Sequence, residues 1–311
     1  NSLNQSYSRS NKWNARGRLE WQPDTLTNIM FRPTFSYSTS DGTSTSTSGT
    51  YNDNPYNYVA DPLLASSIAQ MSADSLMVNS RSLNSISYTQ KQEAGGMLQL
   101  NRRLSANGRN VTVRADVDYA KTNAKSLSLS NVHLYQVKDA TGVDSTYQTN
   151  RYLQTPATAW TYSLQATYSE PLWRGTYLQF RYKYGYSRTT SDRATFDFSN
   201  LGEGFFGSQS PLYRGWNNYL SMLASPYESY RDQRLSRSSV YTNYTHELEM
   251  MLRFVGKKYK LNAGFMVQPQ SSHFTQNYLG QFADTTRSVF NVSPALELRY
   301  KFSDVSQLRI N

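Results

Sequence analysis

Apolar and polar residues alternate along this chain in repeated runs. In residues 160–187, WTYSLQATYSEPLWRGTYLQFRYKYGYS, every second position on both sides of the central SEPLWRG is apolar or aromatic. Each run lasts about nine residues, and a period of two is typical of a β-strand with one apolar face. The residues between are mainly Thr, Ser, Gln, Arg and Lys. The stretch therefore predicts a hairpin whose two faces meet different surroundings.

The alternation recurs from end to end and predicts about ten strands in about five hairpins. One run, from Val111 to Tyr119, alternates with Thr, Arg and Asp without a break. The alternating positions that we assign to the apolar faces are Trp13, Ala15, Gly17, Leu19, Trp21, Ile29, Phe31, Phe35, Tyr37, Gly96, Leu98, Leu100, Val111, Val113, Ala115, Val117, Tyr119, Trp160, Tyr162, Leu164, Ala166, Tyr168, Leu178, Phe180, Tyr182, Tyr184, Tyr186, His246, Leu248, Met250, Leu252, Phe254, Tyr259, Leu261, Ala263, Phe265, Val267, Val292, Leu296, Leu298 and Tyr300.

The connections between these runs alternate between short turns and long polar segments. We expect short turns near Asp24, Asn107, Pro171, Gly256 and Asp304, and long loops at about 40–91, 122–155, 189–237 and 270–287. The stretch STSDGTSTSTSGT (38–50) has the low complexity of a mobile loop. The segment DPLLASSIAQM predicts one short helix with Asp61 as its N-cap and Pro62 at the first position.

Three features favour a membrane β-barrel over a soluble β-sandwich. The strands reach the 9–11 residues of a tilted membrane strand, whereas soluble strands average about 5–6. Aromatic residues gather at the ends of the apolar faces, and short turns alternate with long loops. We therefore predict an all-β, transmembrane, antiparallel up-and-down β-barrel. Pro33 and Pro294 fall inside strands, where we expect local bulges or, for Pro294, a strand start.

Composition narrows the class of protein. The 311 residues include no Cys, so disulfides, zinc–thiolate sites and thiol catalysis are excluded. No run of 18 apolar residues occurs, which excludes a helical membrane protein. The net charge is +10, but the basic residues stand singly among acidic ones, a pattern that does not favour nucleic-acid binding. The opening NSLNQSYSRS has no apolar core and shows no signal peptide.

Three stretches resemble a known family: YSEPLWRGTYLQFRYKYGYS, LNAGFMVQPQSSHF and SPALELRYKFSDVSQLRIN. They are similar to the outer-membrane β-barrel family common in Bacteroidetes and related to TonB-dependent receptors. The resemblance implies uptake of nutrient or siderophore-type ligands across the Gram-negative outer membrane, with energy from the TonB complex acting through a plug. Because the sequence shows no plug and no closing strand with a terminal aromatic, we expect residues 1–311 to be one segment of a larger barrel.

The charged residues between the apolar positions are candidates for the wall of a wet lumen. We expect them to pair across strands as ladders rather than to act in catalysis. Two aromatic-rich and Asn/Asp-rich segments are candidate ligand-binding loops, and Asp53 is a candidate Ca²⁺ ligand. The lumen charges are Arg114, Asp116, Asp118, Arg181, Lys183, Glu247, Glu249, Arg253, Glu297 and Arg299, and the loop residues are Tyr51, Asp53, Tyr56, Tyr58, Phe205, Phe206 and Trp216.

Other function classes have weaker support in the residues. The three histidines have no partners at zinc-ligand spacing, and His246 fits an amphipathic residue at the membrane interface. No Gly-x-Ser-x-Gly motif supports an outer-membrane hydrolase, so we expect no enzyme and no cofactor. The remaining alternative is a soluble or cell-surface all-β binding module of the carbohydrate-binding or adhesin type.

Overall fold

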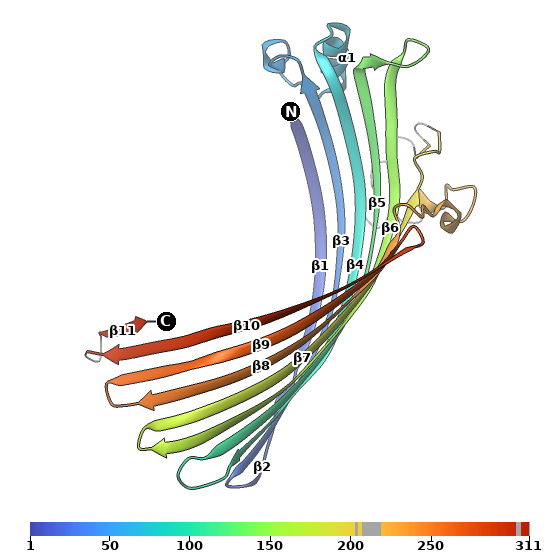
Figure 1. The fold of residues 1–311 in the computed structure, drawn as a ribbon. Helices are drawn as coiled ribbons and strands as arrows, with labels where there is room; N and C mark the ends of the chain where they lie inside the picture. Colours follow the sequence, from blue (N-terminus) through green and yellow to red (C-terminus); the bar gives the residue numbers. More distant parts are fainter. Residues whose placement is uncertain (203–204, 207–218, 303–305, 311) are drawn as a thin grey trace.

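The computed structural model describes residues 1–202, 205–206, 219–302 and 306–310, and these form one large antiparallel sheet (Figure 1). Helices are confined to the connections between strands. The elements are β1 (Ser2–Arg16), β2 (Leu19–Asp24), β3 (Thr27–Tyr51), η1 (Pro55–Asn57), α1 (Ala65–Ala73), β4 (Met77–Arg103), β5 (Asn110–Lys138), β6 (Asp144–Trp173), β7 (Thr176–Asp197), η2 (Tyr227–Tyr230), β8 (Arg237–Val255), β9 (Tyr259–Tyr278), β10 (Gln281–Lys301) and β11 (Gln307–Ile310).

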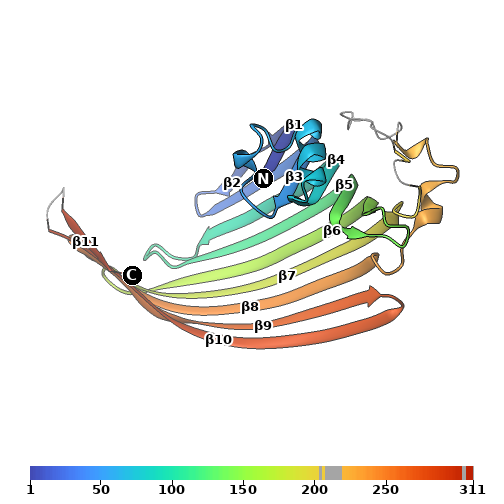
Figure 2. The ribbon, with the colours of Figure 1, turned by 90° about the horizontal axis from the view of Figure 1, so that it is seen from above.

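Strands that follow one another in the sequence lie side by side in the sheet. The order is β1-β3-β4-β5-β6-β7-β8-β9-β10-β11, and β2 continues the line of β1 against β3. The expected all-β, antiparallel, up-and-down arrangement is confirmed. Figures 1 and 2 show that the sheet is strongly curved and twisted. Within the described residues, β1 and β11 each pair on one side only, so the curved sheet is open.

The register brings the alternating apolar positions of all strands onto one face. Leu98 lies opposite Ala115, and Ala115 lies opposite Leu164 on the next strand. The same alignment continues through Tyr182 and Leu248, because no register shift lies between these pairs and the rest of the belt. We call this surface the apolar belt; its large members are Trp13, Leu19, Trp21, Ile29, Phe31, Phe35, Leu98, Leu100, Val113, Val117, Trp160, Tyr162, Leu164, Leu178, Phe180, Tyr182, Leu248, Met250, Leu252, Leu261, Phe265, Val267, Val292, Leu296 and Leu298.

The long loops predicted at 40–91, 122–155, 189–237 and 270–287 are largely wrong, because the strands run far into them. β4, β5 and β6 contain 27, 29 and 30 residues. The Ser/Thr-rich segment 38–50 is paired strand between β1 and β4, and Ser44 Oγ lies 2.7 Å from Ser85 Oγ. Thr fits a β-strand well, and Ser and Thr form cross-strand hydrogen bonds without an apolar period. Sequence periodicity therefore missed these strands.

The remaining connections are of two kinds. Segments 52–76 and 198–236 are long, whereas 139–143 and Leu279–Gly280 are tight turns. The helix predicted in segment 52–76 is present, but its predicted cap is wrong. Leu64 occupies the N-cap without a side-chain hydrogen bond, and Asp61 instead accepts a hydrogen bond from the Leu63 N–H at 3.1 Å. An aspartate in such a local turn uses its carboxylate before the helix begins.

The bulges expected at Pro33 and Pro294 are also wrong, since neither position shows a register shift, and the alternative of a strand start at Pro294 is wrong because β10 begins at Gln281. Gly17 donates its N–H to the Pro33 carbonyl at 3.0 Å, and a Cβ on Gly17 would lie 3.0 Å from the proline ring. Pro294 lies where β10 pairs with β9 alone, because β11 begins pairing only at Leu298. An edge position tolerates proline because no neighbouring strand requires its missing N–H. One register shift instead follows Pro171 near the β6–β7 turn.

Candidate functional site on the two faces and the upper rim of the sheet

The apolar belt consists of large side chains that no other part of the described chain covers. Trp160 is 48% exposed, Leu164 50%, Leu248 50% and Phe265 44%. Soluble monomers rarely expose such a broad continuous apolar surface, so the belt marks contact with a partner or a membrane. A groove of about 500 Å³ runs along it and is lined mainly by Val111, Ala166, Phe180, Leu248, Met250 and Phe265.

Aromatic residues border the belt at both ends. The Trp160 and Tyr119 ring centroids are 4.5 Å apart, and those of Tyr162 and Tyr186 are 4.6 Å apart. At the end with the short turns, Trp173 lies 6.5 Å from Phe254. We call the first border the upper girdle; it contains Tyr119, Trp160, Tyr162, Tyr184, Tyr186, Tyr244 and His246. Such rings combine an apolar body with a polar group, which suits an interface between hydrocarbon and water.

The opposite face of the sheet carries the ten charged residues predicted for the lumen. Arg114 donates to the Asp116 carboxylate at 2.7–3.1 Å, with both groups on β5. Lys183 Nζ lies 3.8 Å from Glu247 on the adjacent strand. Arg114 and Asp116 are two residues apart on one strand, whereas Lys183 and Glu247 lie opposite each other on neighbouring strands. All four lie on the polar face. The structure therefore groups them as cross-strand and same-strand pairs.

Four other members of the set meet polar partners, whereas the expected pairing is wrong for Arg299, whose neighbours across both ladders are cations. Arg181 pairs with Glu249, and the partly buried Glu249 carboxylate is the less exposed of the two. Glu297 accepts a hydrogen bond from Asn262 at 2.8 Å and lies 3.5 Å from Arg309. Arg253 donates to Gln179 at 3.4 Å. Asp118 borders a hollow of about 510 Å³, and Arg299 lies opposite Lys260 and Arg309 in the register.

The first candidate binding loop is held by contacts within itself. Tyr51 donates its hydroxyl to the Pro62 carbonyl at 2.9 Å. The Asp53 carboxylate accepts from the Asn54 N–H at 2.7 Å and from the Tyr58 hydroxyl at 3.1 Å, and this hydrogen bond raises the pKa of Tyr58. Tyr56 is 62% exposed. Among the described residues, no group of three or more His, Asp and Glu side chains is placed to hold a metal ion.

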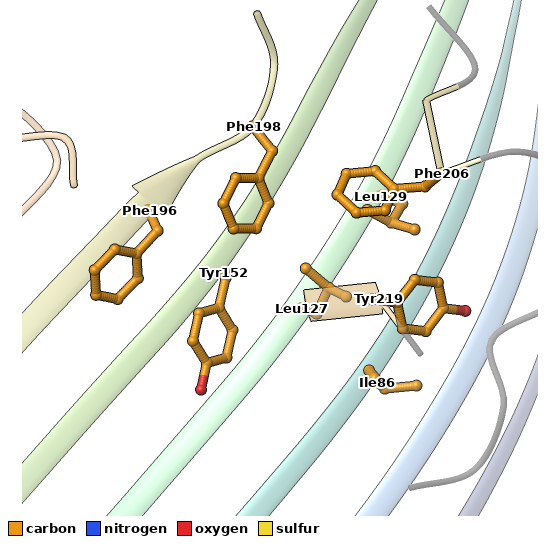
Figure 3. Packing of buried hydrophobic residues seen from close by; sticks show 8 residues of the cluster. All are labelled: Ile86, Leu127, Leu129, Tyr152, Phe196, Phe198, Phe206 and Tyr219. Atoms are coloured by element: carbon orange, nitrogen blue, oxygen red, sulfur yellow. The ribbon is translucent and has the colours of Figure 1, made fainter. Parts of the chain in front are cut away.

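The second candidate loop instead contributes to an apolar core. Phe206 is only 4% exposed and packs against Phe198, which is fully buried (Figure 3). Phe205 lies at its margin, and Trp216 lies outside the described residues. This group, which we call the upper cluster, contains Ile86, Leu127, Leu129, Tyr152, Phe196, Phe198, Phe206 and Tyr219. Phe206 is therefore occupied by packing.

The upper cluster lies on the same face of the sheet as the apolar belt. Ile86 pairs with Leu127, Leu127 with Tyr152, and Tyr152 with Phe196, in unbroken register with the belt residues below them. The described parts of segment 198–236, which are residues 198–202, 205–206 and 219–236, supply the covering side chains, and Figures 1 and 2 show these parts beside the upper ends of β6 and β7. Above the belt, the chain thus covers its own apolar face.

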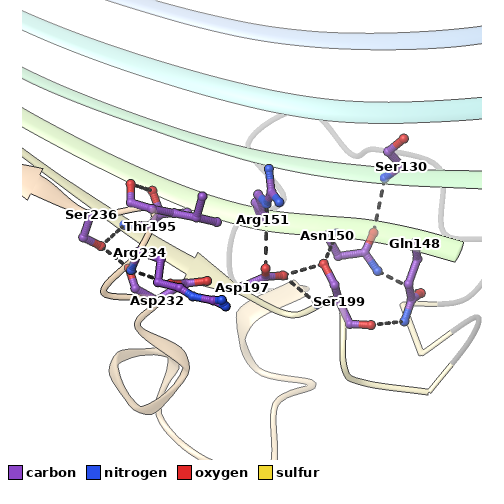
Figure 4. A network of polar contacts seen from close by, with 11 residues as sticks. Ser130, Gln148, Asn150, Arg151, Thr195, Asp197, Ser199, Asp232, Arg234 and Ser236 are labelled. Carbon is purple, nitrogen blue, oxygen red and sulfur yellow. Dashed lines mark hydrogen bonds and ion pairs between the residues drawn. The ribbon is translucent and has the colours of Figure 1, made fainter. Parts of the chain in front are cut away.

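Polar contacts attach both ends of segment 198–236 to the strands (Figure 4). At the start, the Ser199 N–H donates to Asp197 at 2.9 Å and the Ser199 hydroxyl accepts from the Asn150 N–H at 3.1 Å. At the end, the Ser236 hydroxyl accepts from the Thr195 N–H at 3.0 Å. These bonds satisfy backbone groups that burial would otherwise leave unpaired.

A pocket of about 630 Å³ lies at the upper tips of β3–β6, between α1 and the start of segment 198–236. Its walls carry amides, hydroxyls, one guanidinium and one imidazole, including Arg81, Asn131, His133, Tyr147, Gln148 and Ile68. Our sequence analysis missed this group because it assigned 122–155 to a loop. The alternation in SLSLSNVHLY (126–135) was the available signal, with Ser in place of charged residues.

No family model matches the chain, and no curated protein matches its sequence. In the part of the chain that the structure describes, no helix has the length and apolar character needed to cross a membrane. Among solved structures, similar ones include the ferric preacinetobactin receptor BauA from Acinetobacter baumannii, with 9% identity and a TM-score of 0.45 over 97% of this chain and 45% of that chain. The ferric citrate transporter FecA in its unliganded form is 12% identical, with a TM-score of 0.38 over 99% of this chain and 42% of that chain. The open form of the ferric-catecholate import receptor Fiu from E. coli K12 is 8% identical, with a TM-score of 0.41 over 97% of this chain and 52% of that chain. The chain therefore spans about half the length of these structures.

Proposed function

We propose that this chain forms part of the wall of an outer-membrane β-barrel of the TonB-dependent-receptor type, which takes up nutrient or siderophore-type ligands. The apolar belt carries the proposal. Its exposed side chains span neighbouring strands without interruption, and the opposite face of the same strands carries paired charges. A protein surface of this kind suits hydrocarbon on one side and a wet lumen on the other.

The height of the belt agrees with the thickness of a membrane. On β5 it extends from Val111 to Tyr119 and ends in the upper girdle. A tilted strand of about 9–11 residues crosses the hydrocarbon core of a bilayer. Between neighbouring strands the ladder satisfies the backbone N–H and C=O groups, as a medium without water requires. In this arrangement the membrane lipid is the partner of the belt.

The receptor part of the proposal rests on the polar face and on the three quoted sequence stretches that resemble the Bacteroidetes barrel family. The charged ladders would line the lumen, and the exposed residues Asp53, Tyr56 and Tyr58, with the half-buried Tyr51 beside them, would meet a small or oligomeric ligand outside the cell. The TonB complex would supply energy through a plug. We propose no catalytic role, because ion pairs already occupy several of the carboxylates on the polar face.

Fractionation tests the proposal against the alternative of a soluble all-β binding module. We expect the protein to sediment with outer membranes and to require detergent for extraction, because the belt would otherwise face water. Recovery of a monodisperse, folded protein in detergent-free buffer would overturn the membrane assignment.

Orientation can be tested with protease-cleavable tags in intact cells. We propose that the short turns face the periplasm and that the long strand tips face outward, as in other outer-membrane barrels. Gly142 and Gly280 lie in tight turns with positive φ, and an added Cβ would meet nothing within 4 Å, so the tags are inserted beside these glycines, which are kept. Tags there should be cleaved from outside, and a tag at Asn107 should be protected. The reverse pattern would overturn the proposed orientation.

A further inference from the structure

Two cations stand just beyond the upper girdle, on the same side of the sheet as the belt. Lys121 follows Tyr119 by two residues on β5, so both side chains lie on that face. Arg188 on β7 lies opposite Trp160, and Trp160 lies opposite Tyr119. The order across the three strands is therefore a cation and a tyrosine on β5, the Trp160 indole on β6, and a second cation on β7.

Lys121 and Arg188 are exposed, and neither takes part in an ion pair between residues that the structure describes. The described carboxylates on this face above the girdle of β3–β7 are Asp41, Asp192 and, at the far end of β6, Asp144, which pairs with Lys138. Asp41 is 3% exposed and lies opposite Arg9 and Tyr88. Asp192 lies two residues beyond Thr190 on the same face of β7, opposite Ser238.

The opposite border of the belt has one cation with a carboxylate partner and another without. There Arg109 donates two hydrogen bonds to the Glu170 carboxylate, at 2.8 and 2.5 Å, so its charge is compensated within the protein. An exposed cation held at a membrane interface without a protein carboxylate is placed to meet an anionic headgroup. Arg102 on β4 is exposed on the belt face without an ion pair to a described residue, so the upper border is distinguished by two such cations on either side of one indole.

Polar groups beside the two cations could complete the contacts of a headgroup. Lys121 lies opposite Gln92 and Thr158, and the Thr158 and Thr190 hydroxyls are 2.5 Å apart. A hollow of about 280 Å³ follows directly above, lined by Tyr88, Asn123, Ala124, Lys125, Gln154 and Pro156. The Lys125 ammonium lies 5.5 Å from the centre of the Tyr88 ring. Amides, hydroxyls and an aromatic ring in this arrangement suit a sugar that carries phosphate.

We propose that Lys121 and Arg188, with Trp160 between them, bind the phosphate of a phosphorylated glycolipid in the outer leaflet of the membrane. The neighbouring hollow would accept the sugar of the same headgroup. This inference rests on the proposed function, because the membrane position of the belt sets the height of the two cations. It assigns a lipid site on the outer wall that is separate from the lumen and from the ligand path.

The test compares lipid retention by variants produced in outer membranes and extracted in mild detergent. The probes are bisphosphorylated lipid A and the same lipid with both phosphates removed, each titrated in mixed micelles and quantified on the isolated protein. We expect Lys121→Gln/Arg188→Gln to weaken retention of the phosphorylated probe by about 25-fold, since each basic residue near an anionic surface contributes about 1 kcal/mol, or fivefold. Lys121→Arg/Arg188→Lys should retain it.

The matched control is Lys12→Gln/Arg16→Gln. Lys12 is in register with Thr122, the neighbour of Lys121, through Ser38 and Lys91, but it lies on the polar face, and both control cations are exposed. Equal losses in the two double variants, or equal retention of the two probes, would overturn the glycolipid site while leaving the membrane assignment intact. Failure of the unmodified protein to enter membranes would overturn the proposed function and this inference together. Heat-shifted migration on gels checks that each variant is folded.

Discussion

The lower and upper parts of the same strands solve the problem of an apolar face in opposite ways. In the apolar belt, Phe180 is 43% exposed and touches no covering segment. Above the upper girdle, on the same face, Phe198 is fully buried, and segment 198–236 packs over the strands. The two regions share strands, register and side of the sheet, so they differ only in what lies beside them.

The difference follows from the solvent on each side. Hydrocarbon is as apolar as a leucine side chain, so lipid-facing residues need no protein cover. In water the same exposure would cost about 25 cal/mol for each Å² of apolar surface. The upper cluster therefore resembles a small soluble core, with aromatic packing and a polar clamp at both ends of its covering segment.

The largest effect should come from a cavity in the upper cluster. Phe198→Ala removes a fully buried ring and should destabilise the packing of segment 198–236 by about 3–5 kcal/mol. We expect rapid proteolytic cleavage within this segment while the belt stays protected in the membrane. The matched control is Phe282→Ala on β10, where the ring is 67% exposed, and it should change little. Similar protease resistance in both variants would show that the cluster is not a cooperative core.

A charge in the belt should have the next largest effect. Phe180→Arg places a guanidinium toward hydrocarbon near mid-strand and should lower the free energy of unfolding in lipid by about 2–4 kcal/mol. Ser163→Arg, on the polar face of β6, should be nearly silent because the Ser163 hydroxyl lies 3.3 Å from Asp116. Gln179→Arg is a poorer control, since Gln179 contacts Arg253. Equal losses in a lipid-refolding titration would reverse the assignment of the faces.

Adding a methyl group between closely spaced strands on the polar face, opposite the belt, should have a smaller effect. A Cβ at Gly264 would overlap the Met250 carbonyl and lie 2.8 Å from Met251 Cα, whereas at Gly185 its nearest atom would be 3.8 Å away on Thr245. Gly264→Ala should therefore destabilise the protein by about 1–3 kcal/mol, as overpacking does. Gly185→Ala should stay within about 0.5 kcal/mol of the unmodified protein. Unfolding midpoints in lipid would distinguish the two, and a neutral Gly264→Ala would argue against the close approach of β8 and β9.

The smallest effect concerns the turn between β5 and β6. The Thr141 hydroxyl and the Val143 and Thr141 N–H groups donate to Asp139 and lower the pKa of its carboxyl group. A lowered pKa adds stability above the unfolded value near 3.9, and this stability is lost as the pH falls through the folded value. The protection factor of the Val143 amide, which removes the intrinsic pH dependence of exchange, should thus be high at pH 6 and fall well below about pH 4. Asp139→Ala should show low protection at both pH values; protection factors identical to those of the unmodified protein would exclude a role for the carboxylate.

Sequence periodicity located the belt because its alternation is strong on both faces. Leu164 and Gln165, for example, differ sharply in polarity, and the structure pairs their neighbours in the expected register. The same reasoning failed for Ser44 and Ser85, where both faces are polar and the alternation disappears. It also assigned Phe206 to a binding loop, because burial by a distant strand leaves no local signal in the sequence.

The sequence by itself determined which residues share the apolar face of each strand, since a period of two fixes their side whatever their neighbours are. It also determined most of the short turns and the ten charged residues on the polar face. Only the tertiary structure decided how far the strands extend, where segment 198–236 lies, and that Lys121 and Arg188 flank Trp160 from strands on either side. These features depend on pairing between residues far apart in the chain, and cross-strand contacts leave no fixed spacing in a single sequence.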